Sequence, residues 1–242
     1  MAVTEDITQA EPENPIRKRL PYTVNRAIDY ASFLFVQRVT GFRVSDTPEF
    51  DAESLAYFRE RLAAAGSYLE FGSGGSTVLA ARQGLPFVCV ETDPVFLRAV
   101  EDKIKAEGRH DAAKQTYIHA NIGLTEAWGT PLRRSRTPAQ IARWSRYPAA
   151  PWETMADLPG PYLILVDGRF RVACALMAGK FLQGREGEIL FDDHRNRPDY
   201  HPVQRHLELQ RHVGRMAVYK PRADIDPTAI DADIELYCRD WR

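Results

Sequence analysis

The sequence predicts an α/β fold: a doubly wound, Rossmann-like, mostly parallel seven-stranded sheet with helices on both faces and a C-terminal antiparallel strand. Two observations predict it. From residue 67 onward, near-continuous apolar runs alternate with helical patterns, as is typical of parallel strands buried on both faces. The last two strand-like runs have no helix between them, which indicates a closing hairpin. A chain of 242 residues is long enough for one large domain of this kind.

Three parts are expected along the chain. Residues 1–20 are polar, contain proline and lack a periodic pattern, so we expect them to be disordered. Residues 21–66 are expected to form N-terminal helices. Residues 67–242 are expected to form the Rossmann-like domain, with an insertion at 124–160 that is rich in Arg, Pro and Trp.

Two helices are predicted before the sheet. Residues 22–40 carry apolar side chains at helical spacing and therefore predict an amphipathic helix. We expect its aromatic stripe to pack on the main domain, while a membrane-surface role or a homodimer contact stays open as an alternative. Residues 51–66 predict a second helix, with Asp51 as its N-cap and Gly66 at its C′ position.

The strands and helices of the main domain follow in a regular order. The first five strand-like runs are SYLEFG, PFVCVETD, QTYIHANIG, YLILVDG and GEILFDD. Helices are predicted from Ser76, from Pro94 and over the run RVACALMAGKFL. Residues 201–214 are also expected to be helical. The closing hairpin is expected from the runs at 215–222 and 233–240.

Composition and charge exclude several classes of protein. The net charge of −1 provides no overall field for nucleic acid or for an anionic membrane. The longest apolar runs are far shorter than the ~20 residues of a membrane-spanning helix, and the N-terminus lacks the apolar core of a signal peptide. Three scattered cysteines give neither a disulfide framework nor a zinc spacing, which favours the reducing cytoplasm.

The corner after the first strand is rich in glycine. The stretch YLEFGSGGSTVLAA, residues 68–81, places Gly72, Gly74 and Gly75 between a strand and a helix. One glycine would suffice for a turn, so several indicate a ligand close to the backbone, with an anionic group at the helix N-terminus. Glu91 follows roughly 20 residues later, the spacing at which an acid reaches ribose hydroxyls. Together these features predict a nucleoside cofactor.

The details of the corner distinguish between cofactors. The dinucleotide pattern G-x-G-x-x-G/A has Thr77 at its third small position, which disfavours a nicotinamide cofactor. The stretch LEFGSGGST instead resembles motif I of class I S-adenosylmethionine-dependent methyltransferases, and VETD and ANIG resemble that family's ribose and adenine positions. The resemblance implies S-adenosyl-L-methionine as cofactor, held by Glu70, Gly72, Ser73, Gly74, Gly75, Ser76 and Thr77 at the methionine, Glu91 and Thr92 at the ribose, Asn121 and Ile122 at the adenine, and Asp167 nearby.

Acids also end the fourth and fifth strands. Asp167, Asp192 and Asp193 should rise at the same edge of the sheet, where three carboxylates repel one another unless a cation intervenes. Such oxygen ligands suit Mg²⁺. The pattern resembles the small-molecule O-methyltransferases of the catechol and macrolide-sugar type, which implies that these three residues hold an ion that orients the substrate hydroxyl.

The predicted catalytic set is Asp167, Arg169 and His194. The catechol enzymes have a lysine base shortly after the strand-four acid, whereas this chain has Arg169 and Arg171 there. Arginine is a poor base, so His194 is the better candidate. The alternative is structural: Asp193 and His194 cap the next element and Arg169 pairs with a carboxylate. His201, His206 and His212 do not share a helical face and are expected to be solvated.

The insertion at 124–160 combines five arginines with three aromatic residues near its centre. This composition favours a small-molecule substrate that is anionic or aromatic, although a solvated insertion would have the same composition. The sequence thus predicts a methyltransferase acting on a small molecule, at oxygen. An NAD(P)-dependent oxidoreductase and a non-catalytic binding protein with the same fold stay open as alternatives.

Overall fold

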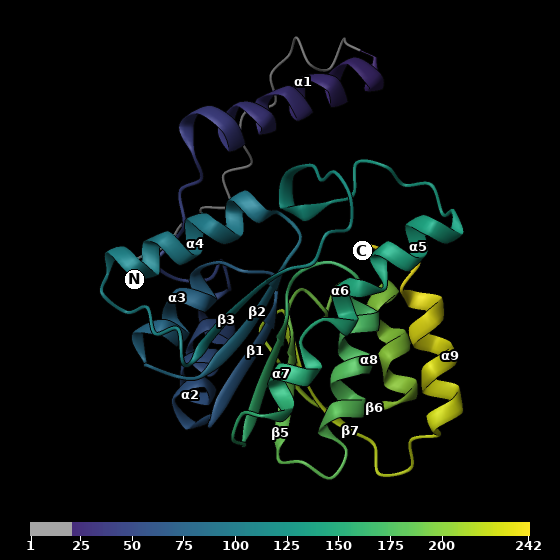
Figure 1. Cartoon of the computed structure of the whole chain (residues 1–242). Helices are drawn as coiled ribbons and strands as arrows, with labels where there is room; N and C mark the ends of the chain where they lie inside the picture. The colour runs from purple at the N-terminus through teal and green to yellow at the C-terminus, as the bar shows by residue number, and fades with distance from the viewer. Residues whose placement is uncertain (1–20) are drawn as a thin grey trace, which may run out of the picture. The chain divides into compact units, whose positions relative to one another are not determined.

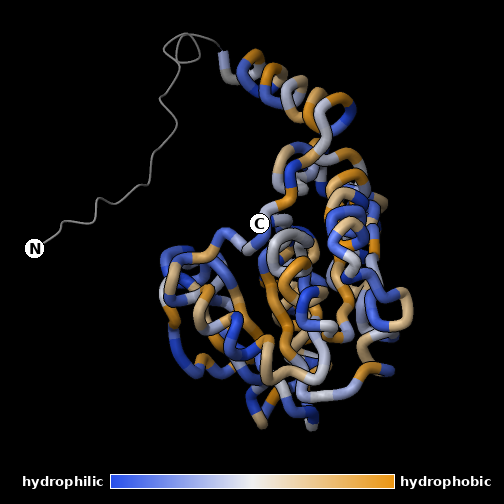
Figure 2. The backbone as a smooth tube through the Cα atoms, turned by 90° about the vertical axis from the view of Figure 1, so that its left-hand side faces the viewer, coloured by the Kyte–Doolittle hydropathy of each residue, from blue (hydrophilic) through white to orange (hydrophobic). Residues whose placement is uncertain are grey.

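The computed structural model describes residues 21–242, and the chain separates after Gly41 into two units (Figure 1). The predicted disorder of residues 1–20 and the start of the first unit lie outside the described residues. The described part of the first unit is a helix, α1 (Tyr22–Phe35), that continues as a π-helical turn, η2 (Val36–Thr40). Apolar and polar residues are interspersed along α1 (Figure 2), as expected for an amphipathic helix. The helix is confirmed, and its binding role stays a prediction.

The second unit contains a seven-stranded sheet in the order β3-β2-β1-β4-β5-β7-β6. The strands are β1 (Ser67–Phe71), β2 (Phe87–Glu91), β3 (Gln115–His119), β4 (Tyr162–Val166), β5 (Gly187–Phe191), β6 (Leu207–Val213) and β7 (Met216–Pro221). β1 to β5 are mutually parallel, while β7 runs antiparallel to both β5 and β6. The predicted fold class is confirmed. The strand order reverses at β1, and ligands bind at such a switch point.

Helices cover both faces of this sheet (Figure 1). One face carries α2 (Ala52–Ala64), α3 (Gly75–Arg82) and α4 (Pro94–Ala106), and the other carries α8 (Arg171–Leu182) and α9 (Pro227–Tyr237). Alternate residues of each strand enter the two cores: Leu69 and Phe71 face α8, whereas Tyr68 faces α2 and α3. The same alternation turns Glu70 toward α3, which determines its role at the site.

The insertion forms short elements over the α8 face. They are η3 (Ala127–Gly129), α5 (Pro138–Trp144), α6 (Arg146–Ala149) and α7 (Trp152–Ala156). Trp144 and Tyr147 have at most 1% of their surface exposed and join the core, so this part of the insertion is packed. Its arginines are mostly exposed.

Helix α2 begins as predicted, with the Asp51 side chain accepting a hydrogen bond from Ser54 N at 3.0 Å. Helix α2 belongs to the second unit and contacts the sheet directly, because Ser54 Oγ donates a hydrogen bond to the Val213 carbonyl of β6 at 2.8 Å. Gly66 does follow the C-cap residue Ala65, as predicted, but it lacks the positive φ by which a glycine usually ends a helix. The helix ends at Ala64 with an extended cap residue, and Gly66 is needed because a Cβ atom there would lie 2.2 Å from the Gly160 carbonyl oxygen.

The C-terminal elements differ from their predictions. Residues 207–213 form strand β6 rather than part of a helix, and the hairpin consists of β6 and β7. Residues 227–237 form helix α9 where a strand was expected. Asp226 caps α9 by accepting from Thr228 N at 2.8 Å, and Pro227 occupies its first turn. A 3₁₀ helix, η4 (Pro198–Arg205), precedes β6.

Candidate functional site

The three glycines of the corner after β1 have different physical reasons. Gly72 has φ of +96°, and a Cβ atom there would lie 2.9 Å from the Gly168 Cα. The segment before α2 packs directly against Gly75, because a Cβ atom added there would lie 2.2 Å from the Thr47 carbonyl. Gly74 has an extended backbone and faces open space, with no atom within 4 Å of an added Cβ. Packing explains two glycines, and the third leaves room for a ligand at the start of α3.

Glu70 supports this loop from below. Its side chain has no exposed surface and accepts hydrogen bonds from the hydroxyls of Tyr68, Ser76 and Thr77. Burial raises the pKa of Glu70 to about 8, against the effect of these hydroxyl donors. Thr77 Oγ1 also accepts from Gly74 N at 2.9 Å. The network fixes the loop, and the Glu70 carboxyl does not reach the open side where a methionine ammonium was expected.

Glu91 joins the loops that follow β1 and β2. One carboxylate oxygen accepts from Ser73 N at 3.0 Å and Ser73 Oγ at 3.1 Å, and the other accepts from Thr92 N at 2.6 Å. Only 8% of Glu91 is exposed. The insertion passes close by, since Thr92 Oγ1 donates to the Gly129 carbonyl at 3.3 Å. A ribose would reach Glu91 only after these hydroxyl groups turn away.

Asn121 and Ile122 follow β3 at the same edge. Ala120 N donates to the Glu91 carbonyl at 2.9 Å, which brings the segment beside the predicted ribose acid. Asn121 is exposed, and its Oδ1 accepts from Gly123 N at 3.0 Å. Ile122 is fully buried. Asn121 is thus available at the surface, while Ile122 can form only the floor of an adenine site.

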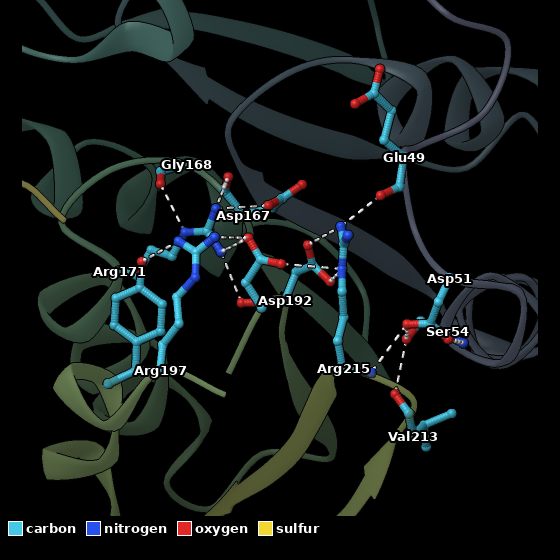
Figure 3. Close-up of polar contacts among 12 residues, drawn as sticks. Glu49, Asp51, Ser54, Asp167, Gly168, Arg171, Asp192, Arg197, Val213 and Arg215 are labelled. Atoms are coloured by element: carbon cyan, nitrogen blue, oxygen red, sulfur yellow. Dashed lines mark hydrogen bonds and ion pairs between the residues drawn. The ribbon is translucent and has the colours of Figure 1, made fainter. Parts of the chain in front are cut away.

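The acids after β4 and β5 converge as the sequence predicts, and arginines lie between them (Figure 3). Arg171, with 5% of its side chain exposed, donates to Asp167 Oδ1 at 3.0 Å and to the Asp192 carbonyl at 2.8 Å. Arg215 from the β6–β7 turn donates two hydrogen bonds to the Asp192 carboxylate, at 3.0 and 2.7 Å. Arg197 pairs with Asp193 at 2.8 Å.

These guanidinium groups provide the positive charge for which a magnesium ion was expected. Within residues 21–242, no group of three His, Cys, Asp or Glu side chains could hold a metal. The magnesium prediction therefore has no support in this geometry. Asp167 keeps a third of its side chain exposed, and desolvation raises its pKa to about 7, with Arg171 opposing and Asp192 reinforcing the shift.

The two other predicted catalytic residues lie in different surroundings. His194 has no exposed surface, and its Nε2 lies 2.8 Å from the Tyr219 hydroxyl. Burial lowers the pKa of His194 to about 4, so the ring is neutral, and it has no open path to a substrate. Arg169 is two residues from Asp167 but does not form the carboxylate pair of the structural alternative, because Arg171 pairs with Asp167. Burial lowers the pKa of Arg169.

The sequence did not indicate two of the side-chain pairs that involve buried aspartates. Arg215 lies 23 residues beyond Asp192 in the chain, in a turn after a strand that was predicted to be a helix, so no local pattern indicated it. His206 was expected to be solvated, but it is 4% exposed and its Nε2 lies 2.7 Å from Asp233 Oδ2.

No helix among the described residues has the length and apolar character that crossing a bilayer requires.

Comparisons with known proteins agree with this fold. No family model and no curated protein matches the sequence. Among solved structures, a methyltransferase-like protein from Silicibacter pomeroyi is 29% identical, with a TM-score of 0.67 over 82% of this chain and 100% of its own. A putative caffeoyl-CoA O-methyltransferase from Staphylococcus aureus is 13% identical, with a TM-score of 0.41 over 86% of this chain and 95% of its own. A Podospora anserina methyltransferase solved with bound SAH is 15% identical, with a TM-score of 0.43 over 84% and 98%. The predicted resemblance to methyltransferases is confirmed at the level of the fold.

Proposed function

We propose that this protein is an S-adenosylmethionine-dependent methyltransferase that acts on a small-molecule acceptor, at an oxygen atom. One observation carries the proposal: Gly74 faces open space at the N-terminus of α3, although packing already accounts for Gly72 and Gly75. The likeness to the Silicibacter methyltransferase-like protein, over its whole length, supports the same assignment.

The chain offers a group for each part of the cofactor. The backbone of Ser73 to Gly75, at the positive end of α3, suits the methionine carboxylate. Glu91 suits the ribose hydroxyls once the hydroxyls of Ser73 and Thr92, each 3.1 Å from a Glu91 carboxylate oxygen, release it, and we assign Asn121 to the adenine. The bound cofactor would supply an electrophilic methyl group on its sulfonium sulfur.

The proposed role of Asp167 is to accept the acceptor's proton. The Asp167 backbone lies at the edge of the sheet next to the glycine corner, because Asp167 N donates to the Phe71 carbonyl at 3.1 Å. A pKa raised to about 7 by desolvation is close to the value that suits a general base at neutral pH. Arg171 orients the carboxylate, and the buried His194 takes no part in the transfer.

The test is calorimetric titration of the purified chain with S-adenosylhomocysteine and, separately, with NAD⁺, each with and without Mg²⁺. The proposal predicts micromolar binding of S-adenosylhomocysteine, no binding of NAD⁺ and no effect of Mg²⁺. Binding of NAD⁺ alone would make the protein a nicotinamide-dependent enzyme. Binding of neither would mean that the glycine corner is purely structural.

A further inference from the structure

Arg169 carries a charge that the described chain does not neutralise. Its neighbours are paired, Arg171 with Asp167 and Arg197 with Asp193. The Arg169 guanidinium forms no hydrogen bond or ion pair within residues 21–242, and its Nε is buried without a partner. The residue as a whole is partly exposed, so an anion from solution could reach the guanidinium and supply the partner that the buried Nε lacks.

A pocket of about 370 Å³ lies at this guanidinium. Its lining includes Arg169, Arg197, Asp199, Tyr200, Trp241 and Arg242. Arg197 pairs with Asp193, and Arg242 pairs with both Asp199 and Asp240, at 2.6 to 2.8 Å. Within residues 21–242, Arg169 is thus the guanidinium group of this pocket that has no ion pair, and Tyr200 and Trp241 belong to the same lining.

The backbone holds Arg169 in place next to the glycine loop. Its predecessor Gly168 lies against Gly72, where a Cβ would come within 2.9 Å of the Gly168 Cα. Its successor Phe170 is fully buried with φ of +53°, a left-handed conformation that costs a non-glycine residue roughly 1 kcal/mol or more. Strain of this kind persists where the surrounding structure fixes a functional side chain.

We propose that this pocket binds the methyl acceptor through a carboxylate or phosphate group that pairs with Arg169. This inference rests on the proposed methyltransferase function and names its substrate class, a small anionic molecule with a flat ring. The guanidinium fork matches a two-oxygen anion, and the partly exposed Trp241 ring in the pocket lining matches a planar body. The acceptor oxygen then lies toward Asp167, two residues before Arg169.

The test compares binding of 4-hydroxybenzoate, phenyl phosphate and the neutral 4-hydroxybenzamide, followed by tryptophan fluorescence and calorimetry, to the protein saturated with S-adenosylhomocysteine. We expect one or both anions to bind at least tenfold more tightly than the amide, and the stronger of the two identifies the preferred anion. Arg169→Gln should lose that preference, and Arg169→Lys should keep part of it. Arg98→Gln, a change at an exposed arginine on α4, should have no effect.

Thermal unfolding of each variant separates a loss of anion binding from a loss of folded protein. Because Arg169 lacks a partner, Arg169→Gln should unfold at the same temperature as the wild type or higher; a lower temperature would indicate a structural role and contradict the inference. Equal binding of amide and anions, or unchanged anion binding by Arg169→Gln, would also overturn it. Binding of S-adenosylhomocysteine with no anion bound would reject this inference alone, whereas failure to bind S-adenosylhomocysteine would reject the proposed function.

Discussion

Gly72 and Gly168 lie against each other, and neither has room for a side chain. A Cβ on Gly168 would lie 2.9 Å from Gly72 N and 2.1 Å from the Tyr147 hydroxyl. The contact joins the loops after β1 and β4, so it sets the position of Asp167 relative to the glycine corner. Gly168→Ala should therefore lower the free energy of unfolding by about 1–3 kcal/mol, as overpacking does.

Urea denaturation measures this effect, and Gly74→Ala is the matched control. Gly74 faces open space, so its replacement by alanine should change the free energy of unfolding by no more than about 0.5 kcal/mol. Equal stability of Gly168→Ala and the wild type would show that the two loops can move apart.

Glu70 should make stability depend on pH. Its folded pKa is raised from 4.5 to about 8, so the folded state holds a proton that the unfolded state has lost between these values. Stability must then fall as the pH rises from about 4.5 to about 8, by on the order of a few kcal/mol at most. Glu70→Gln should flatten this dependence in urea titrations between pH 5 and pH 9. Asp167 titrates in the same range, so some slope should remain. Identical slopes for the variant and the wild type would exclude a buried, proton-holding Glu70.

His194 should make the folded protein less stable at acidic pH. Its folded pKa is lowered from 6.5 to about 4, so the unfolded state takes up a proton first and stability is lost as the pH falls from about 6.5 to about 4. His194→Phe should reduce this loss, because the Tyr219 hydroxyl still has Gln204 as a hydrogen-bond partner at 3.1 Å. Melting temperatures at pH 4.5 and pH 7 measure the effect. Binding of S-adenosylhomocysteine should not change, and a large loss of methyl transfer in this variant would restore His194 as a catalytic candidate.

Arg215 should stabilise the protein by neutralising Asp192. Asp192 is fully buried, so Arg215→Met leaves a buried carboxylate without its partner and should cost about 3 kcal/mol. Adding Asp192→Asn should recover much of that loss, which a double-mutant cycle measures as a coupling free energy above about 1 kcal/mol.

Because arginines occupy the space between the acids, Mg²⁺ should not raise the melting temperature of the wild type. A clear increase would contradict the arginine assignment and revive the metal site.

Local patterns predicted the fold well where each element is decided by its own residues. The five parallel strands and the helices between them follow from buried apolar runs and from capping residues such as Asp93, which accepts from Val95 N at 2.8 Å. The chain beyond residue 200 was harder. Strand β6 lies at the sheet edge with mostly exposed side chains, so its alternation is weak and its partner β7 decides its structure.

The sequence predicted where the residues of the candidate site lie in the fold better than it predicted which side chains they contact. The glycine corner, Glu91 and the three acids do gather at one edge, because the carboxyl ends of parallel strands meet there. The strand alternation that buries Tyr68 could also have placed Glu70 beneath the loop. The contact of Gly75 with Thr47 and the pairing of Arg215 with Asp192 come from segments distant in sequence, and no spacing rule indicates them.

Titration of Gly74→Val and the wild type with S-adenosylhomocysteine tests whether the open space at Gly74 holds the cofactor. We expect micromolar binding by the wild type and at least tenfold weaker binding by the variant, because the valine side chain fills the space above the N-terminus of α3. The melting temperatures of the two proteins should agree, since that space is open in the folded chain. Equal affinity in both proteins would contradict the account, because the one glycine that packing does not explain would then have no ligand to accommodate.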